Sequence, residues 1–167
     1  MDTTATNDGY LQIILLAAFL IPAILFLLTQ QNTLKVIRPE NRSLAPGLVW
    51  LQLIPLLGQI WQFIVISRIA SSIQREVAAS DDNSILGFAD VAAVEAANDK
   101  PTQVIGIAYC TLNVIVIVLN GFLRITGDFL LGVGAFATLG ATTCWIIYWV
   151  KLAGWKRKLK QKLQLSL

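Results

Sequence analysis

The sequence contains no histidine, and it has only two cysteines, Cys110 and Cys144. Histidine is the commonest general base and the usual side-chain ligand of zinc and haem iron, so its absence removes the ordinary routes to acid–base and metal chemistry. Two isolated cysteines make a metal site only with carboxylates beside them, and the Asp and Glu residues fall in predicted loops. No GxGxxG, Walker A or GxSxG pattern occurs. The sequence therefore predicts a protein that is not an enzyme and that needs no cofactor or metal.

Charged residues are scarce as well, at 14% of the chain, whereas a soluble domain needs about 25% to cover its surface. Hydrophobic residues make up 56%, and the mean hydropathy is +0.66. Runs without any charge cover residues 9–34, 43–67, 101–123 and 129–150. Each run exceeds the roughly 18 to 20 residues with which a helix crosses about 30 Å of hydrocarbon. Because lipid offers no partner to an unpaired amide, the runs predict an all-α integral membrane bundle, one domain of 167 residues with four apolar helical segments.

We expect these helices at about 10–30, 47–78, 103–123 and 129–160, with a polar loop at 79–100. Ile66, Ile69, Ile73 and Val77 recur at helical spacing, so the second helix should continue past residue 68 and emerge along the membrane surface. Residues 85–98 are expected to form a short helix within the polar loop. The N-terminus lacks the Lys or Arg of a cleavable signal peptide, so the first helix is expected to remain in the protein.

The topology of the second segment has two solutions. Lys and Arg concentrate on the cytoplasmic side of a membrane protein. Four spans with the N-terminus inside place 9 of the 13 basic residues in the cytoplasm, whereas a re-entrant second segment with the N-terminus outside places all except Arg124 there. Pro55 and Gly58 permit the tip of a hairpin, but long charge-free runs span far more often than they turn back. Both solutions predict a multi-pass protein of the bacterial inner membrane with a cytoplasmic C-terminus.

Amide side chains follow one face of the second and third helices at about 100° per residue. Amides within a membrane need partners, and neighbouring helices supply them. One interpretation is that these amides hold a bundle together, and the other is that they line a polar path. No ionisable residue lies at mid-depth, which argues against an ion-coupled pump. The candidate polar stripe comprises Gln52, Gln59, Gln62, Asn113 and Asn120, with Pro55 on the same face as the glutamines.

The C-terminal tail combines an apolar side, which includes Leu159 and Leu163, with a basic remainder. Such a helix can lie in the headgroup layer, where each cation contributes about 1 kcal/mol against anionic lipid. Nucleic-acid binding would need a larger basic surface with stacking aromatics and is not expected. The candidate headgroup contacts are Trp155, Lys156, Arg157, Lys158, Lys160 and Lys162.

Residues 38–76, RPENRSLAPGLVWLQLIPLLGQIWQFIVISRIASSIQRE, carry a recognisable pattern. It consists of a PENR turn at 39–42, a PGxVWLxLIP core at 46–55, Trp61, and an IAxSIxxE helix at 69–76. In these features the segment resembles a family of small polytopic membrane proteins of Bacteroidota-type bacteria. No activity is assigned to that family, so the resemblance implies no catalytic or binding residue. It does imply that this segment is the signature element, with a special geometry between Pro55 and Gly58.

Taken together, these features predict a small non-enzymatic accessory or interaction subunit of the bacterial inner membrane. Its expected partners are the lipid bilayer, with anionic headgroups at the tail, and either another membrane protein or a second copy of the chain. The alternative is an oligomeric channel or transporter lined by the Gln and Asn stripes.

Overall fold

The computed structural model describes residues 3–55, 57–81, 100, 102–126 and 131–165. All regular secondary structure in these ranges is helical, which confirms the all-α prediction. The predicted polar loop lies almost wholly outside the described residues, and the short helix at 85–98 lies entirely outside them. The elements in chain order are α1 (Thr3–Val36), η1 (Pro39–Asn41), η2 (Pro46–Leu53), α2 (Leu57–Asp81), α4 (Gln103–Thr126) and α5 (Leu131–Leu165).

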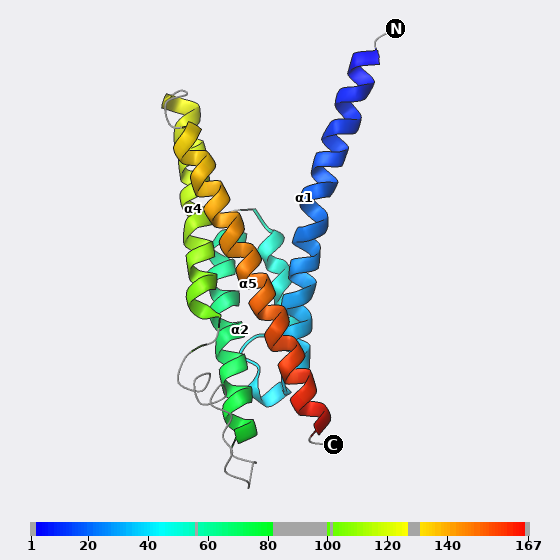
Figure 1. Ribbon diagram of the computed structural model, residues 1–167, viewed down its shortest axis with the longest axis vertical. Coiled ribbons are helices and arrows are strands. Elements are labelled where there is room, and N and C mark those ends of the chain that lie inside the picture. The colour runs from blue at the N-terminus through cyan, green and yellow to red at the C-terminus, as the bar shows by residue number, and fades with distance from the viewer. Residues whose placement is uncertain (1–2, 56, 82–99, 101, 127–130, 166–167) are drawn as a thin grey trace.

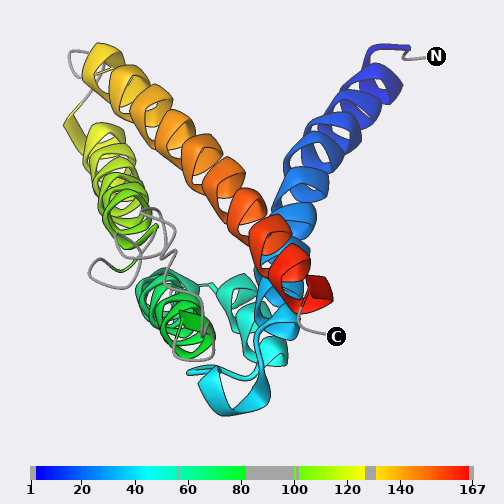
Figure 2. The same ribbon diagram turned by 60° about the horizontal axis from the view of Figure 1, so that its bottom comes forward.

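The helices form a bundle that is closed at one end and open at the other (Figures 1 and 2). Helices α4 and α5 run antiparallel side by side, and α5 then crosses the C-terminal half of α1. Beyond this crossing, the N-terminal half of α1 diverges from the other helices. The C-terminus and the loop between α1 and η2 lie at the closed end, opposite the N-terminus.

Two helices are long and apolar enough to cross a membrane by length and composition, Tyr10–Val36 and Gly134–Gln161. A shorter apolar helix covers Gln103–Leu119. Continuous apolar runs specified the expected helices at 10–30, 103–123 and 129–160, and the observed helices contain most of each range. Of the four apolar segments expected from the sequence, two are helices that meet this test within the described residues, and four spans are not shown.

The prediction of one continuous helix over 47–78 is wrong. The segment begins as the 3₁₀ helix η2, breaks at Ile54 and Pro55, and resumes as α2. Proline has no amide hydrogen to donate, and it disfavours a helical conformation in the residue before it. After the break, the Leu57 amide donates to the Pro55 carbonyl (2.7 Å) and the Gly58 amide donates to the Ile54 carbonyl (2.7 Å). The chain reverses direction there, so that η2 and α2 lie side by side (Figure 2).

Side-chain contacts fix an antiparallel register between the two arms. The Trp61 indole Nε1 donates to the Leu48 carbonyl at 2.7 Å. Farther from the turn, the Ser43 amide donates to Ser72 Oγ at 2.8 Å. Residue numbers rise along one arm as they fall along the other, which defines a hairpin. We call the described residues of 38–81 the hairpin, residues 53–55 and 57 its tip, and the end formed by residues 38–43 and 72–76 its base.

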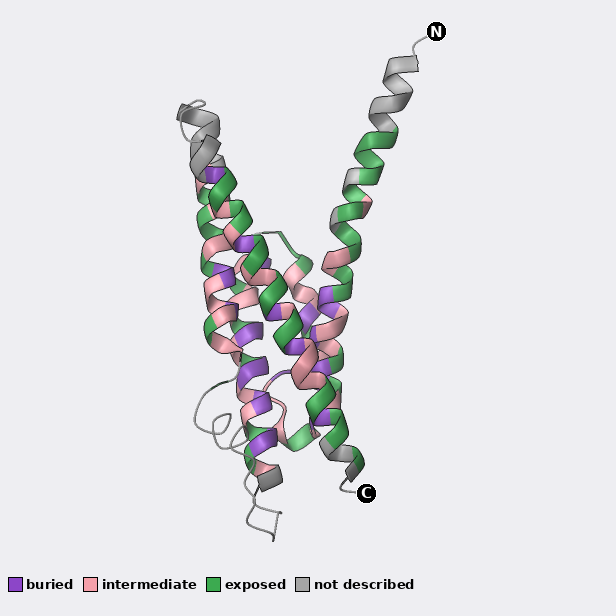
Figure 3. Cartoon of the chain, in the orientation of Figure 1, coloured by how far each residue is buried: buried purple, intermediate pink, exposed green. Residues whose placement is uncertain are grey.

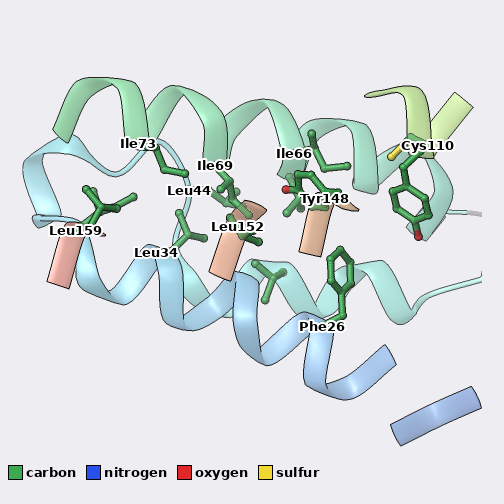
Figure 4. Close-up of a cluster of buried hydrophobic side chains, with 14 of the residues drawn as sticks. Phe26, Leu34, Leu44, Ile66, Ile69, Ile73, Cys110, Tyr148, Leu152 and Leu159 are labelled. Atoms are coloured by element: carbon green, nitrogen blue, oxygen red, sulfur yellow. The ribbon is translucent and has the colours of Figure 1, made fainter. Parts of the chain in front are cut away.

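The buried core occupies the closed end of the bundle (Figures 3 and 4). Tyr148 and Leu152 of α5 are fully buried there against the isoleucines of α2. Helix α4 approaches closely because residue 106 is glycine: a Cβ there would lie 2.9 Å from Tyr148 Cε2 and would overlap Ile66 Cγ2. Helix α2 does continue past residue 68 as predicted, but its apolar stripe faces this core instead of the membrane surface. The stripe comprises Ile66, Ile69, Ile73 and Val77.

Candidate functional site

The predicted polar stripe is divided by the reversal of the chain. Gln52 lies on η2, whereas Gln59 and Gln62 lie on α2, so the three do not share one helix face. Gln52 Nε2 donates to Gln30 Oε1 at 2.6 Å and to the Val49 carbonyl at 2.9 Å. Gln52 therefore ties the first arm of the hairpin to α1. The helical spacing that grouped these residues does not apply across a turn.

Two members of the stripe meet on Tyr109 of α4. Asn113 Nδ2 donates to the Tyr109 hydroxyl at 3.5 Å, and Gln62 is hydrogen-bonded to the same tyrosine. Gln62 Oε1 also lies 3.9 Å from the thiol of Cys110. These contacts join α2 to α4 within one chain. They match the interpretation in which the amides hold the bundle together.

The remaining members contribute differently. Gln59 is half-buried, and its Oε1 has no hydrogen-bond partner among the described residues. Asn120 belongs to α4, but its side chain lies outside the described part of the structure. Gln30 Nε2 and the Tyr148 hydroxyl are likewise buried without a partner among the described residues. The polar interior thus contains unused hydrogen-bonding capacity at these three side chains.

An aromatic cluster marks the crossing of α1 and α5. The ring centroid of Phe26 lies 5.6 Å from Trp145, 5.9 Å from Tyr148 and 6.0 Å from Trp149, each in an edge-on arrangement. Such pairs contribute about 0.5 to 1.5 kcal/mol beyond their buried area. Trp149 Nε1 also donates to Thr29 Oγ1 at 3.0 Å. Sequence reasoning did not identify this cluster, because Phe26 is far from the other members along the chain and only the fold brings them together.

The base of the hairpin contains a buried carboxylate that sequence reasoning also missed. Glu76 of α2 is only 5% exposed. It accepts hydrogen bonds from Arg38 Nε (2.8 Å), from the Arg38 amide (3.2 Å) and from Asn41 Nδ2 (2.7 Å). Charge-assisted bonds of this kind are about twice as strong as neutral ones. The usable signal was the combination of the PENR turn with the glutamate that ends the 69–76 motif.

Arg42 of the same turn caps α1. The last carbonyls of a helix have no partner within the helix, and a cation is favourable near them. Arg42 Nε donates to the Ile37 carbonyl at 2.7 Å, and Nη2 donates to the Lys35 carbonyl at 3.0 Å. The PENR residues therefore end α1, turn the chain and bind α2.

The basic tail is the continuation of α5 and not a separate surface helix. Leu159 is buried in the same cluster as Leu44 and Ile73 (Figure 4), so this part of the apolar side packs on protein instead of lipid. Lys158 Nζ lies 5.1 Å from the centroid of the Trp155 ring, a cation–π contact. Of the other predicted headgroup contacts, Lys156 is half-buried, Arg157 and Lys160 are exposed, and the Lys162 side chain lies outside the described part of the structure.

Among the described residues, no group of three or more His, Cys, Asp or Glu side chains is arranged to hold a metal ion. Comparison of the chain with family models, with curated proteins and with solved structures finds no match. The resemblance of residues 38–76 to small bacterial membrane proteins therefore stays a prediction.

Proposed function

We propose that the chain is a small non-enzymatic integral membrane protein that acts as an accessory or interaction subunit in the bacterial inner membrane. The observation that carries this proposal is the exposure of the N-terminal half of α1. Its large apolar side chains are 58% to 67% exposed at Tyr10, Leu11, Ile13, Ile14 and Leu16. At about 100° per residue these five positions are spread over more than half of the helix circumference, and this half of α1 diverges from the other helices (Figure 1). An apolar helix of this kind is suited to lipid and to a transmembrane helix of a partner.

The proposed orientation is multi-pass with a cytoplasmic C-terminus. The base of the hairpin and the end of α5 lie at the same end of the bundle (Figure 1). Most of the Lys and Arg residues belong to these two segments of the sequence. The positive-inside rule assigns this end to the cytoplasm. There the exposed Arg157 and Lys160 are available to anionic headgroups.

The test is purification from native membranes in a mild detergent, followed by measurement of the mass of the complex and identification of its components. A foreign membrane protein in stoichiometric amount is the expected result. Recovery of the chain alone as a monomer would contradict the proposal. Catalytic turnover or substrate flux by the purified chain in liposomes would contradict it as well.

A second candidate function is an oligomeric channel or transporter, and the Gln59 Oε1, which has no partner among the described residues, favours it. In this alternative, several copies would enclose a path lined by the Gln and Asn stripes. It predicts a homo-oligomer and solute flux in liposomes that contain only this chain. Gln59→Leu should then abolish the flux while leaving the Tm unchanged, and retention of flux in that variant would exclude this alternative.

A further inference from the structure

We propose that the hairpin is re-entrant: it enters the membrane from the side of the C-terminus, reaches mid-depth and returns to the same side. This inference rests on the membrane location proposed above. It assigns the N-terminus to the opposite face of the membrane and places an apolar tip at the centre of the bilayer.

The contact between Arg38 and Glu76 is the strongest argument. If residues 43–67 spanned the membrane, these two side chains would lie on opposite faces, separated by about 30 Å of hydrocarbon. Instead, Arg38 Nε lies 2.8 Å from Glu76 Oε1, and Asn41 binds the same carboxylate at 2.7 Å. The two ends of the segment are therefore joined at one level. A base containing charged groups belongs at the interface, because charges at mid-bilayer are costly.

The length of the first arm supports the same conclusion. Helix η2 has eight residues, and a 3₁₀ helix rises about 2.0 Å per residue, so this arm extends about 16 Å. That is roughly half of a 30 Å hydrocarbon layer. The tip that it reaches is apolar and open: Leu53, Ile54 and Leu57 are 52%, 43% and 47% exposed. These side chains suit contact with acyl chains.

Non-helical backbone is tolerated at membrane depth only where protein covers it and its polar groups are paired. The first arm meets this condition where α1 and α2 cover it, and at the tip the amides of Ile54, Leu57 and Gly58 are paired although the side chains are exposed. At the tip, the Ile54 amide donates to the Leu51 carbonyl at 3.2 Å, and the Gly58 amide donates to the Ile54 carbonyl at 2.7 Å. Along the first arm, the Leu48 carbonyl accepts a hydrogen bond from the Trp61 indole. Helices α1 and α2 both pack against η2.

The charge distribution agrees with this arrangement. With a re-entrant hairpin, twelve of the thirteen Lys and Arg residues fall on the side of the C-terminus, and Arg124 alone falls on the other. The C-terminal end of α5 is also tied to the hairpin, because Leu159 is buried together with Leu44 of the first arm. The base of the hairpin and the C-terminus therefore occupy the same side of the membrane.

Single-cysteine labelling tests this topology. In a Cys110→Ala, Cys144→Ala protein, Asp2, Leu53, Ala45 and Gln161 are replaced by cysteine one at a time. Ala45 lies at the start of the first arm and Gln161 lies near the end of α5, and both are exposed. Right-side-out membrane vesicles are treated with an impermeant maleimide, first sealed and then opened by freeze–thaw. A parallel extraction with alkaline carbonate reports whether the chain is embedded.

We expect Asp2→Cys to react in sealed vesicles, and Ala45→Cys and Gln161→Cys to react only after opening. Leu53→Cys should stay unlabelled in both states. Labelling of Ala45→Cys in sealed vesicles, with Gln161→Cys protected, would overturn re-entry and establish a span. Reaction of Leu53→Cys would overturn the mid-membrane tip. Release of the chain by carbonate, with every position reactive in sealed vesicles, would instead overturn the membrane location itself.

Discussion

Glu76 has a structural role that no other described residue shares, because it is the only charged residue among them whose side chain is buried. It is bonded to Arg38, which lies 38 positions earlier in the chain, and to Asn41, which lies 35 positions earlier. Hydrogen bonds to charged groups contribute about 1.5 to 3 kcal/mol each, and removal of one partner leaves the other unsatisfied. The Arg38 side chain is one-third exposed, so water replaces part of the interaction that Arg38 loses when Glu76 is removed.

We therefore expect Glu76→Ala to lower the free energy of unfolding by about 2 to 3 kcal/mol, because it opens the base of the hairpin. Glu40→Ala is the matched control: Glu40 also lies near Arg38, but at 3.9 Å and with its side chain 66% exposed. This control should change the stability by less than about 0.5 kcal/mol. Unfolding of the micelle-bound protein in a denaturant titration measures both. Equal losses of unfolding free energy in the two variants would contradict the special role of Glu76.

At the scale of elements, the turn between η2 and α2 depends on the absence of a side chain at residue 58. A Cβ on Gly58 would overlap the Gln52 carbonyl oxygen and would lie 2.9 Å from its carbon. These are backbone atoms, which cannot move aside without changing the hairpin. By contrast, a Cβ on Gly47 of η2 would have no atom within 4 Å.

Gly58→Ala should consequently destabilise the protein by about 3 kcal/mol, whereas Gly47→Ala should remain within about 0.5 kcal/mol of the wild type. Thermal unfolding in detergent measures the two variants under the same conditions. If Gly58→Ala unfolds at the wild-type temperature, the close approach of the two arms is not required for the fold.

Packing of α4 supplies a second pair of glycine variants. Gly106→Ala introduces a methyl group against Tyr148 and Ile66 in the core, and such overpacking costs about 1 to 3 kcal/mol. Gly154 lies in α5, and a Cβ added there would meet no atom within 4 Å. Gly154→Ala should stabilise the helix by up to about 1 kcal/mol, because alanine has the higher helix propensity. The sign of the change in Tm thus distinguishes the two positions, and a gain in Gly106→Ala would contradict the packing.

The helices with continuous apolar runs were predictable, since length and hydropathy alone specify them. The hairpin was not. Pro55 and Gly58 permitted a turn, but the reversal is established by contacts such as Arg38 with Glu76, which a local pattern cannot reveal. For the same reason the grouping of Gln52 with Gln59 failed, although Gln52 does pair with a neighbouring element. Contacts between residues far apart in the sequence decided both outcomes. The bond between Trp149 and Thr29, 120 positions apart, is another contact of this kind.

At the scale of the whole molecule, the buried core and the exposed apolar part of α1 are separated along the long axis of the bundle. The closed end contains the buried core, the capped end of α1 and the base of the hairpin, so it holds the fold together without a partner (Figure 3). The open end contains the N-terminal half of α1, which diverges from the other helices, and the antiparallel pair α4 and α5, which pack on each other (Figure 1). The partner proposed above would therefore bind along the N-terminal half of α1 without disturbing the core.

This separation predicts where a partner is captured. A photoreactive benzoylphenylalanine replaces either Ile13 of α1 or Val118 of α4, which are 65% and 63% exposed and thus equally accessible. On irradiation of intact membranes, Ile13 should give one defined protein adduct, because this half of α1 packs on no other part of the described chain. Val118 should give lipid adducts alone, because α4 is already packed on α5. A protein adduct at Val118 but not at Ile13 would contradict the assignment of the interaction surface to α1. An Ile13 adduct of twice the chain mass would show that the partner is a second copy of this protein and not a foreign protein.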